Sequence, residues 1–142
     1  MCAVFAGAAK GEEKMAQYIS TLDMSLFVLD YDYNASSPEE LENTHGKFFE
    51  IIRKAHPSLP VLIMSRPVYF PTDEELVRRD IVKKTYENAI SSGDKNVYFI
   101  DGTTLLDECK NEGTVDGIHP TDYGFYCMTK RILPVIRKIL CL

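Results

Sequence analysis

Two features are absent from this sequence of 142 residues, and each absence excludes a class of protein. No apolar run approaches the roughly 20 residues that a membrane-spanning helix needs, so no membrane partner is expected. Basic residues are not in excess, since 16 Lys and Arg face 21 Asp and Glu and the formal net charge is -5. Without a basic stripe the chain cannot displace the counterions of a nucleic-acid backbone, so nucleic acid is excluded as the main partner.

Closely spaced cysteines are absent as well. The four cysteines are scattered along the chain without a C-x-x-C pair, at Cys2, Cys109, Cys127 and Cys141. Zinc sites and disulfide frameworks need closer or more regular spacing, so we expect free thiols in a reducing compartment. The opening MCAVFAGAAKGEEK has no positive residue ahead of its apolar run, which is untypical of a signal peptide. Both observations predict a cytoplasmic location.

What the sequence does contain is an alternation of short apolar runs and amphipathic runs. The apolar runs predict strands at residues 3–7, 25–31, 60–65 and 96–101. Helices are predicted over residues 12–20, from Ser37 to Ala55, from Thr72 to Gly93 and from Thr121 onward. The run at 25–31 has the pattern of a strand buried on both faces, and Pro134 predicts a kink or a break in the last helix. This order predicts one α/β domain over residues 1–142, a three-layer α/β/α sandwich with a mostly parallel sheet.

Ligands of such sheets bind at the carboxyl ends of the strands, so residues that follow strands are the first candidates for a site. Gly7 follows the first predicted strand, and Asn34 follows the second. The stretch TVDGIHPTDYG, which precedes the last helix, places Asp116 three residues ahead of His119. An aspartate that orients a histidine is the acid–base half of a nucleophilic triad. The topology predicts that these residues converge at one edge of the sheet.

These residues carry a resemblance to a known family. The blocks FAGAAKGEEKMAQYI, VLDYDYNASSPEEL, SRPVYF and DGIHPTDYGF resemble those of the SGNH (GDSL-type) hydrolases, in particular their carbohydrate-esterase-like branch. The resemblance implies a flavodoxin-like fold and hydrolysis of small acyl esters, with acetylated sugars as one substrate class and no metal or cofactor. It also implies that His119 is the general base, that Asp116 orients it, and that the Gly7 backbone N–H and the Asn34 side-chain amide are oxyanion donors. Such a base can deprotonate a serine while two donors stabilise the oxyanion.

The sequence departs from the family pattern at its start. The family's nucleophile is a serine in a G-D-S-like turn after a first strand, upstream of the block that contains Gly7. No such block precedes Gly7 here, so we expect a truncated family member without a nucleophile and with very low activity. Ala6 and Ala8 also stand where this branch usually has Ser and Asn. Because a missing central strand leaves backbone groups unpaired, residues 3–7 are expected to pair beside residues 25–31 or to mediate self-association.

Two other functions stay open. FVLDYDYN resembles the opening motif of aspartyl-nucleophile phosphatases, in which Asp30 and Asp32 would perform the chemistry with Mg²⁺. A chain without its serine is alternatively a non-catalytic binding or assembly module, because a fold alone does not confer a function.

The other polar residues of interest are predicted to be structural or solvated. Ser65 follows a strand, but MSRP lacks a nucleophile elbow, so we expect a structural role for it. Five residues are predicted to be solvated on helix surfaces, namely His45, His56, Arg78, Arg79 and Asp80.

Overall fold

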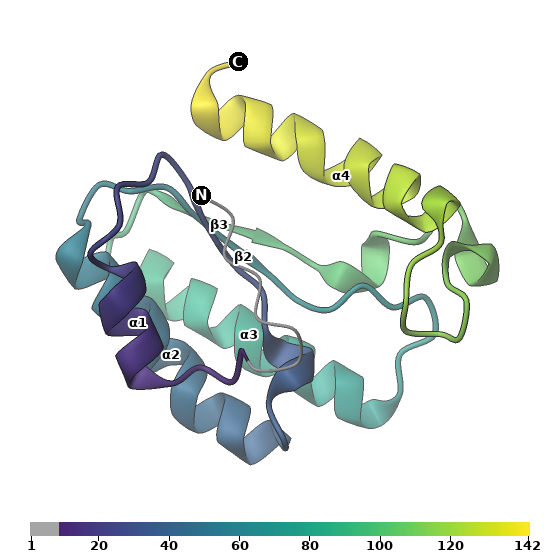
Figure 1. The fold of residues 1–142 in the computed structure, drawn as a ribbon, viewed down its shortest axis with the longest axis horizontal. Coiled ribbons are helices and arrows are strands. Elements are labelled where there is room, and N and C mark those ends of the chain that lie inside the picture. Colours follow the sequence, from purple (N-terminus) through teal and green to yellow (C-terminus); the bar gives the residue numbers. More distant parts are fainter. Residues whose placement is uncertain (1–8) are drawn as a thin grey trace.

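The computed structural model describes residues 9–142, and its centre is a sheet of three parallel strands. The strands are β1 (Phe27–Leu29), β2 (Val61–Met64) and β3 (Val97–Ile100), and they lie side by side in the order β1-β2-β3 (Figure 1). Phe27 pairs with Val61, and Val61 pairs with Val97, so the three strands start at the same level. Their carboxyl ends therefore meet at one edge of the sheet, where the following loops begin.

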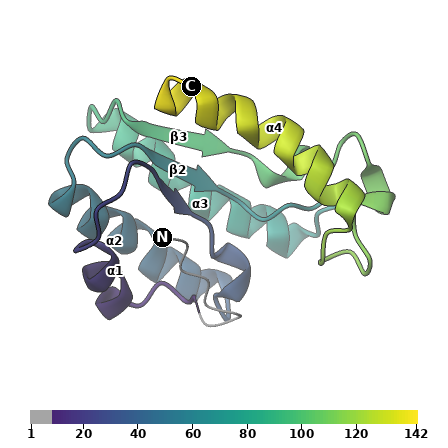
Figure 2. The ribbon, with the colours of Figure 1, turned by 45° about the horizontal axis from the view of Figure 1, so that its top comes forward.

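Helices cover both faces of this sheet (Figure 2). The helices α1 (Glu13–Ile19), α2 (Pro38–Ala55) and α3 (Asp73–Ser91) pack on one face, and α4 (Asp122–Leu140) covers the other. Three short 3-10 helices lie in the loops, namely η1 (Asp32–Asn34), η2 (Gly102–Thr104) and η3 (Lys110–Gly113). The prediction of a three-layer α/β sandwich with a parallel sheet is confirmed.

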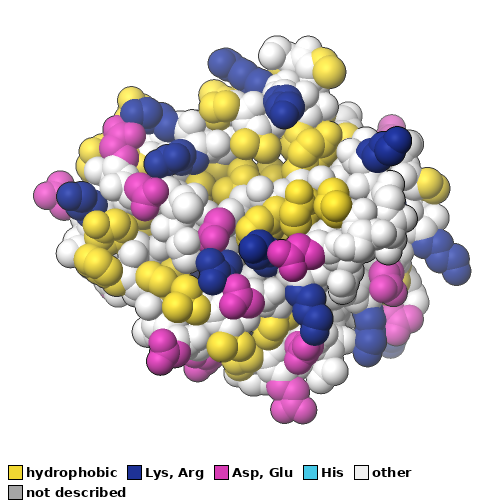
Figure 3. All heavy atoms as spheres, turned by 180° about the vertical axis from the view of Figure 1, so that it is seen from behind, with side chains coloured by type: hydrophobic (Ala, Val, Ile, Leu, Met, Phe, Trp, Pro, Cys, Tyr) yellow, Lys and Arg dark blue, Asp and Glu magenta, His cyan; other side chains and the backbone are white. Residues whose placement is uncertain are grey.

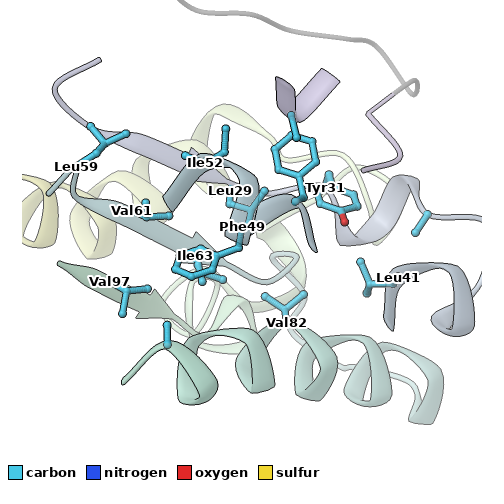
Figure 4. Packing of buried hydrophobic residues seen from close by; sticks show 14 residues of the cluster. Leu29, Tyr31, Leu41, Phe49, Ile52, Leu59, Val61, Ile63, Val82 and Val97 are labelled. Atoms are coloured by element: carbon cyan, nitrogen blue, oxygen red, sulfur yellow. The ribbon is translucent and has the colours of Figure 1, made fainter. Parts of the chain in front are cut away.

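The alternation of side chains along β2 explains why the sheet needs helices on both faces. Val61 and Ile63 belong to the core shared with α2 and α3 (Figure 4), whereas Leu62 and Met64 face α4. All four side chains are buried. Burying a side chain of this size stabilises a fold by about 1.5–3 kcal/mol, so covering either face contributes strongly to folding.

Capping residues explain where two of the helices begin. The side chain of Ser37 accepts a hydrogen bond from the backbone N–H of Glu40 at 3.1 Å, and Pro38 is the first residue of α2. Thr72 and Glu75 form a capping box at the start of α3. Both starts agree with the sequence, because a capping motif is a local pattern that needs no knowledge of the tertiary fold.

The structure differs from the predictions at two of these elements. A break at Pro134 does not occur, since α4 continues through it; Ile132 and Val135 on either side pack against the sheet and outweigh one lost backbone hydrogen bond. The strand β1 is not buried on both faces, since Val28 is 42% exposed. Among the described residues, the core under α4 is formed mainly by β2 and β3. The predicted strand at residues 3–7 lies outside the described residues.

The molecular surface mixes polar and apolar groups. On the face opposite to that of Figure 1, apolar side chains gather in a band across the middle (Figure 3). Acidic and basic side chains are interspersed around this band, so neither charge dominates that face. No helix in the described part of the chain is both long and apolar enough to cross a membrane.

Candidate active site

The loop between η3 and α4 holds Asp116 and His119 in direct contact. Nδ1 of His119 lies 2.7 Å from Oδ2 of Asp116, and the backbone N–H groups of Ile118 and His119 donate to Oδ1 at 2.9 and 2.8 Å. These bonds lower the pKa of Asp116 to about 2, and the backbone N–H of His119 is the largest cause. Asp116 is therefore charged at neutral pH. The His119 side chain is 75% exposed, and no residue of 9–142 hydrogen-bonds its Nε2 atom.

Backbone geometry closes this loop into a compact turn. Gly117 has a φ of 82°, a conformation that favours glycine. The backbone N–H of Val115 donates to the carbonyl oxygen of His119 at 2.9 Å, and a β-bridge pairs Thr114 with Pro120. The residues between Asp116 and His119 thus turn the chain so that the two side chains meet.

Asn34 lies at the end of η1, in the loop after β1. Its backbone N–H donates to the carbonyl oxygen of Tyr31 at 2.9 Å, and its half-buried side-chain amide has no hydrogen-bond partner within residues 9–142. Beside it Asp32 is 2% exposed, and its Oδ2 accepts a hydrogen bond from the backbone N–H of Arg66 at 3.0 Å. The Asn34 amide is therefore free to donate a hydrogen bond, and the turn that carries it is held in place by the buried Asp32.

The guanidinium of Arg78 supports this turn from α3. Its Nη1 donates to the carbonyl oxygens of Asp32 and Ala35 at 2.8 and 3.0 Å, and Glu74 pairs with it from the preceding turn of the helix. Arg78 is 8% exposed, so its predicted solvation is wrong. The physical reason is that the carbonyl groups of η1 point into the protein and need a donor there.

The prediction that His45 is solvated is also wrong. His45 is 1% exposed, its Nδ1 lies 2.8 Å from Oγ1 of Thr85, and its ring stacks on Tyr31 at a centroid distance of 5.4 Å. Burial lowers the pKa of His45 to about 4, so the ring is neutral at pH 7. His56 is half-buried, with Nε2 2.8 Å from the carbonyl oxygen of Ser20. Neither His45 nor His56 combines an exposed ring with a contact to an aspartate, as His119 does.

The remaining predicted residues fall into three groups. Ser65 is structural as predicted, since it is 1% exposed and its Oγ accepts the backbone N–H of Gly102 at 2.8 Å. Arg79 and Asp80 pair with each other, and Asp80 is exposed as predicted. Gly7, the second predicted oxyanion donor, lies outside the described residues.

Asp30 and Asp32, the pair named by the phosphatase hypothesis, differ in accessibility. Asp30 lies at the surface after β1, and partial desolvation together with the nearby charge of Asp32 raises its pKa to about 7. Asp32 is buried against Arg66, and burial raises its pKa too. A metal-dependent phosphatase needs both carboxylates at its substrate, so this geometry does not favour that hypothesis. Within residues 9–142, no group of three or more His, Cys, Asp or Glu side chains is arranged to hold a metal ion.

Arg66 brings the two loops of the candidate site together. Its guanidinium carbon lies 3.8 Å from the centre of the Tyr33 ring in η1, and its Nη2 lies 3.4 Å from the carbonyl oxygen of Gly117. Arg66 therefore contacts both the turn that holds Asn34 and the loop that holds His119. Arg66 was not singled out from the sequence, although it follows a strand directly, which is the criterion that identified Asn34.

A groove of about 670 Å³ lies elsewhere. It runs between α2 and α3, and its lining includes Arg53, Thr85 and the residues just ahead of β3, at the amino end of that strand. Asp116 and His119 do not line this groove.

Comparison with known proteins places the chain in a family. The sequence model of the GDSL-like Lipase/Acylhydrolase family matches residues 3–137. The chain therefore belongs to the GDSL-like lipase/acylhydrolase family, as its motifs predicted. No curated protein matches it.

Solved structures share the fold. A GDSL-like lipase from Bacteroides ovatus is 30% identical with a TM-score of 0.83, and the match covers 94% of this chain and 41% of that one. The salicylyl-acyltransferase SsfX3 from a tetracycline biosynthetic pathway is 21% identical with a TM-score of 0.75, covering 90% of this chain and 42% of that one. An active-site mutant of a family two carbohydrate esterase from Clostridium thermocellum is 19% identical with a TM-score of 0.65, covering 93% and 44%. The chain thus spans less than half the length of these three proteins, and the last two show the fold alone.

Proposed function

We propose that this chain acts in the hydrolysis of carboxylic esters, with small acyl esters as substrates and acetylated sugars as the class we favour. The observation that supports this most is the contact of 2.7 Å between Asp116 and His119, with the other ring nitrogen of His119 open to solvent. Family membership supports the reaction class. The choice of a sugar ester rests on the resemblance of the sequence blocks to the carbohydrate-esterase-like branch of the family.

In the proposed reaction His119 is the general base. The charged Asp116 accepts Nδ1–H, so Nε2 is the basic nitrogen and takes the proton of the attacking hydroxyl group. The attacking oxygen bonds to the ester carbonyl carbon, and the carbonyl electron pair moves onto its oxygen. The Asn34 amide donates to this oxyanion. When the intermediate collapses, the bond to the alcohol breaks and the alcohol takes the proton back from His119.

We further propose that the serine nucleophile is missing. Within residues 9–142, no serine hydroxyl hydrogen-bonds the ring of His119, and the hydroxyl of Ser65 is buried against Gly102. Where triad residues act as a unit, loss of the serine lowers turnover by about six orders of magnitude. Oxyanion donors and substrate binding retain roughly three orders over water. The chain alone is therefore proposed to be a very poor esterase, in which His119 activates water directly.

The test combines an aryl acetate substrate with a serine-directed fluorophosphonate probe. We expect slow hydrolysis above the buffer rate and no covalent adduct by intact mass. Hydrolysis should survive incubation with the probe, because no serine performs it. A stoichiometric adduct on any serine would show that a nucleophile is present. No hydrolysis above buffer would favour the alternative of a non-catalytic binding or assembly module.

A further inference from the structure

Arg66 contacts three separate segments around the candidate site. Its Nη1 pairs with Glu75 in the first turn of α3. Its guanidinium covers the ring of Tyr33 in η1, and its Nη2 reaches the carbonyl oxygen of Gly117. A planar guanidinium suits this combination, because its face can stack on a ring while its edge donates in several directions.

The Arg66 guanidinium is held in position by its side-chain partner and by the backbone of Arg66. The Arg66 side chain is 13% exposed. Its partner Glu75 is itself held, since Oε2 of Glu75 accepts from the backbone N–H and the hydroxyl group of Thr72 at 2.8 and 2.9 Å. The backbone N–H of Arg66 meanwhile donates to Asp32 at 3.0 Å. Both the main chain and the side chain of Arg66 are therefore tied to elements that do not belong to the His119 loop.

The His119 loop has few other attachments to the rest of the protein. The bonds of Asp116 to Ile118 and His119 are local, and so is the bond of the Gly117 N–H to Thr114. Among residues 9–142, the hydrogen bond from Arg66 to Gly117 is the only one that reaches residues 114–119 from outside residues 110–121. Local bonds fix the shape of a loop, but they do not fix its position relative to another loop.

The geometry assigns Arg66 as a positioning residue, which sets where the Asp116–His119 loop lies relative to the Asn34 turn. This inference rests on the proposed function, because in that function His119 and the Asn34 amide act on the same ester group and must be held at a fixed separation. Arg66 acts through Gly117 and Tyr33 and takes no part in proton transfer.

The test uses the full chain labelled with ¹⁵N, in the variants Arg66→Met and Arg66→Lys. For Arg66→Met we expect shifted or exchange-broadened NMR signals at Gly117, His119 and the Asn34 side-chain amide, with the signals of the sheet unchanged. Arg66→Lys should not restore them, because an ammonium group cannot stack on Tyr33 and reach Gly117 together. The His119-dependent hydrolysis rate should fall by roughly one to two orders of magnitude in kcat, with KM unchanged.

Arg79→Met is the matched control, because Arg79 is a partly exposed arginine of α3 that pairs with Asp80 and Asp101. It should leave the signals of both loops unchanged. If Arg66→Met does not fold, Tyr33→Leu removes the stacking partner from an exposed position and should shift the same signals. Unchanged signals of Gly117 and His119 in Arg66→Met, or changes spread evenly over the sheet, would overturn the inference. The NMR readout needs no hydrolysis, so its failure is distinct from failure of the proposed function.

Discussion

The two loops that form the candidate site are held in opposite ways. The turn with Asn34 rests on buried groups, since Asp32 is 2% exposed and Arg78 binds its carbonyl oxygens from α3. The loop with Asp116 and His119 lies on the surface, and most of its hydrogen bonds are within the loop. Substitutions beneath the first loop should therefore lower the free energy of unfolding, whereas substitutions in the second should change chemistry and leave the fold intact.

The largest effect on stability is expected for Arg78→Met. The substitution leaves the carbonyl groups of Asp32 and Ala35 without their donor, and each unsatisfied buried group costs about 1–3 kcal/mol. We expect the free energy of unfolding in urea to fall by about 4 kcal/mol. The control Arg79→Met removes ion pairs that are partly exposed and should cost about 1 kcal/mol or less. Equal losses in the two variants would contradict the role of Arg78 as the buried support of the Asn34 turn.

The second effect is a pH dependence that arises from His45, which lies under the Asn34 turn. Its pKa is lowered from 6.5 to about 4 by burial, so the folded state favours the neutral ring. This contribution is fully present above pH 6.5 and is lost as pH falls through about 4. The contribution of His45 to the free energy of unfolding is about 3 kcal/mol. Between pH 6.5 and 4, the free energy of unfolding should fall by about 3 kcal/mol less in His45→Gln than in the wild type. His56→Gln should show the same fall as the wild type. Identical pH profiles for wild type and His45→Gln would contradict the account.

The smallest effect on stability is expected in the surface loop. The pKa of Asp116 is lowered to about 2, so its contribution to stability is present above about pH 4 and is lost as pH falls through about 2. A ¹³C NMR titration of the Asp116 carboxyl group should have its midpoint near 2. In His119→Ala the midpoint should rise only part of the way toward the ordinary pKa of an aspartate, because the backbone N–H groups at positions 118 and 119 still donate to Asp116. A wild-type midpoint near 4 would mean that these bonds do not persist in solution.

The parts that were predictable from the sequence are those set by local patterns. The parallel order of strands and helices follows from periodicity, and Asp116 meets His119 because only two residues separate them. By contrast, His45 and Arg78 lie on the buried faces of their helices, together with Ile52 and Val82. The sequence predicts polar side chains on a helix to be solvated, and these two are not.

The partners of these buried groups come from distant parts of the chain. His45 meets Thr85 across 40 residues, and Arg78 reaches Asp32 across 46. Arg66 contacts Gly117 across 51 residues. Periodicity assigns a residue to a face of a helix, but it does not tell which carbonyl oxygen or hydroxyl group that face will meet.

The most direct test of the account asks which histidine carries out the slow hydrolysis. Aryl acetate hydrolysis is measured for the wild type, His119→Ala and His56→Gln. We expect His119→Ala to fall to the buffer rate and His56→Gln to retain wild-type activity, because only His119 is paired with Asp116. Equal activity in His119→Ala and the wild type would contradict the claim that the Asp116–His119 pair is the acid–base centre of this chain.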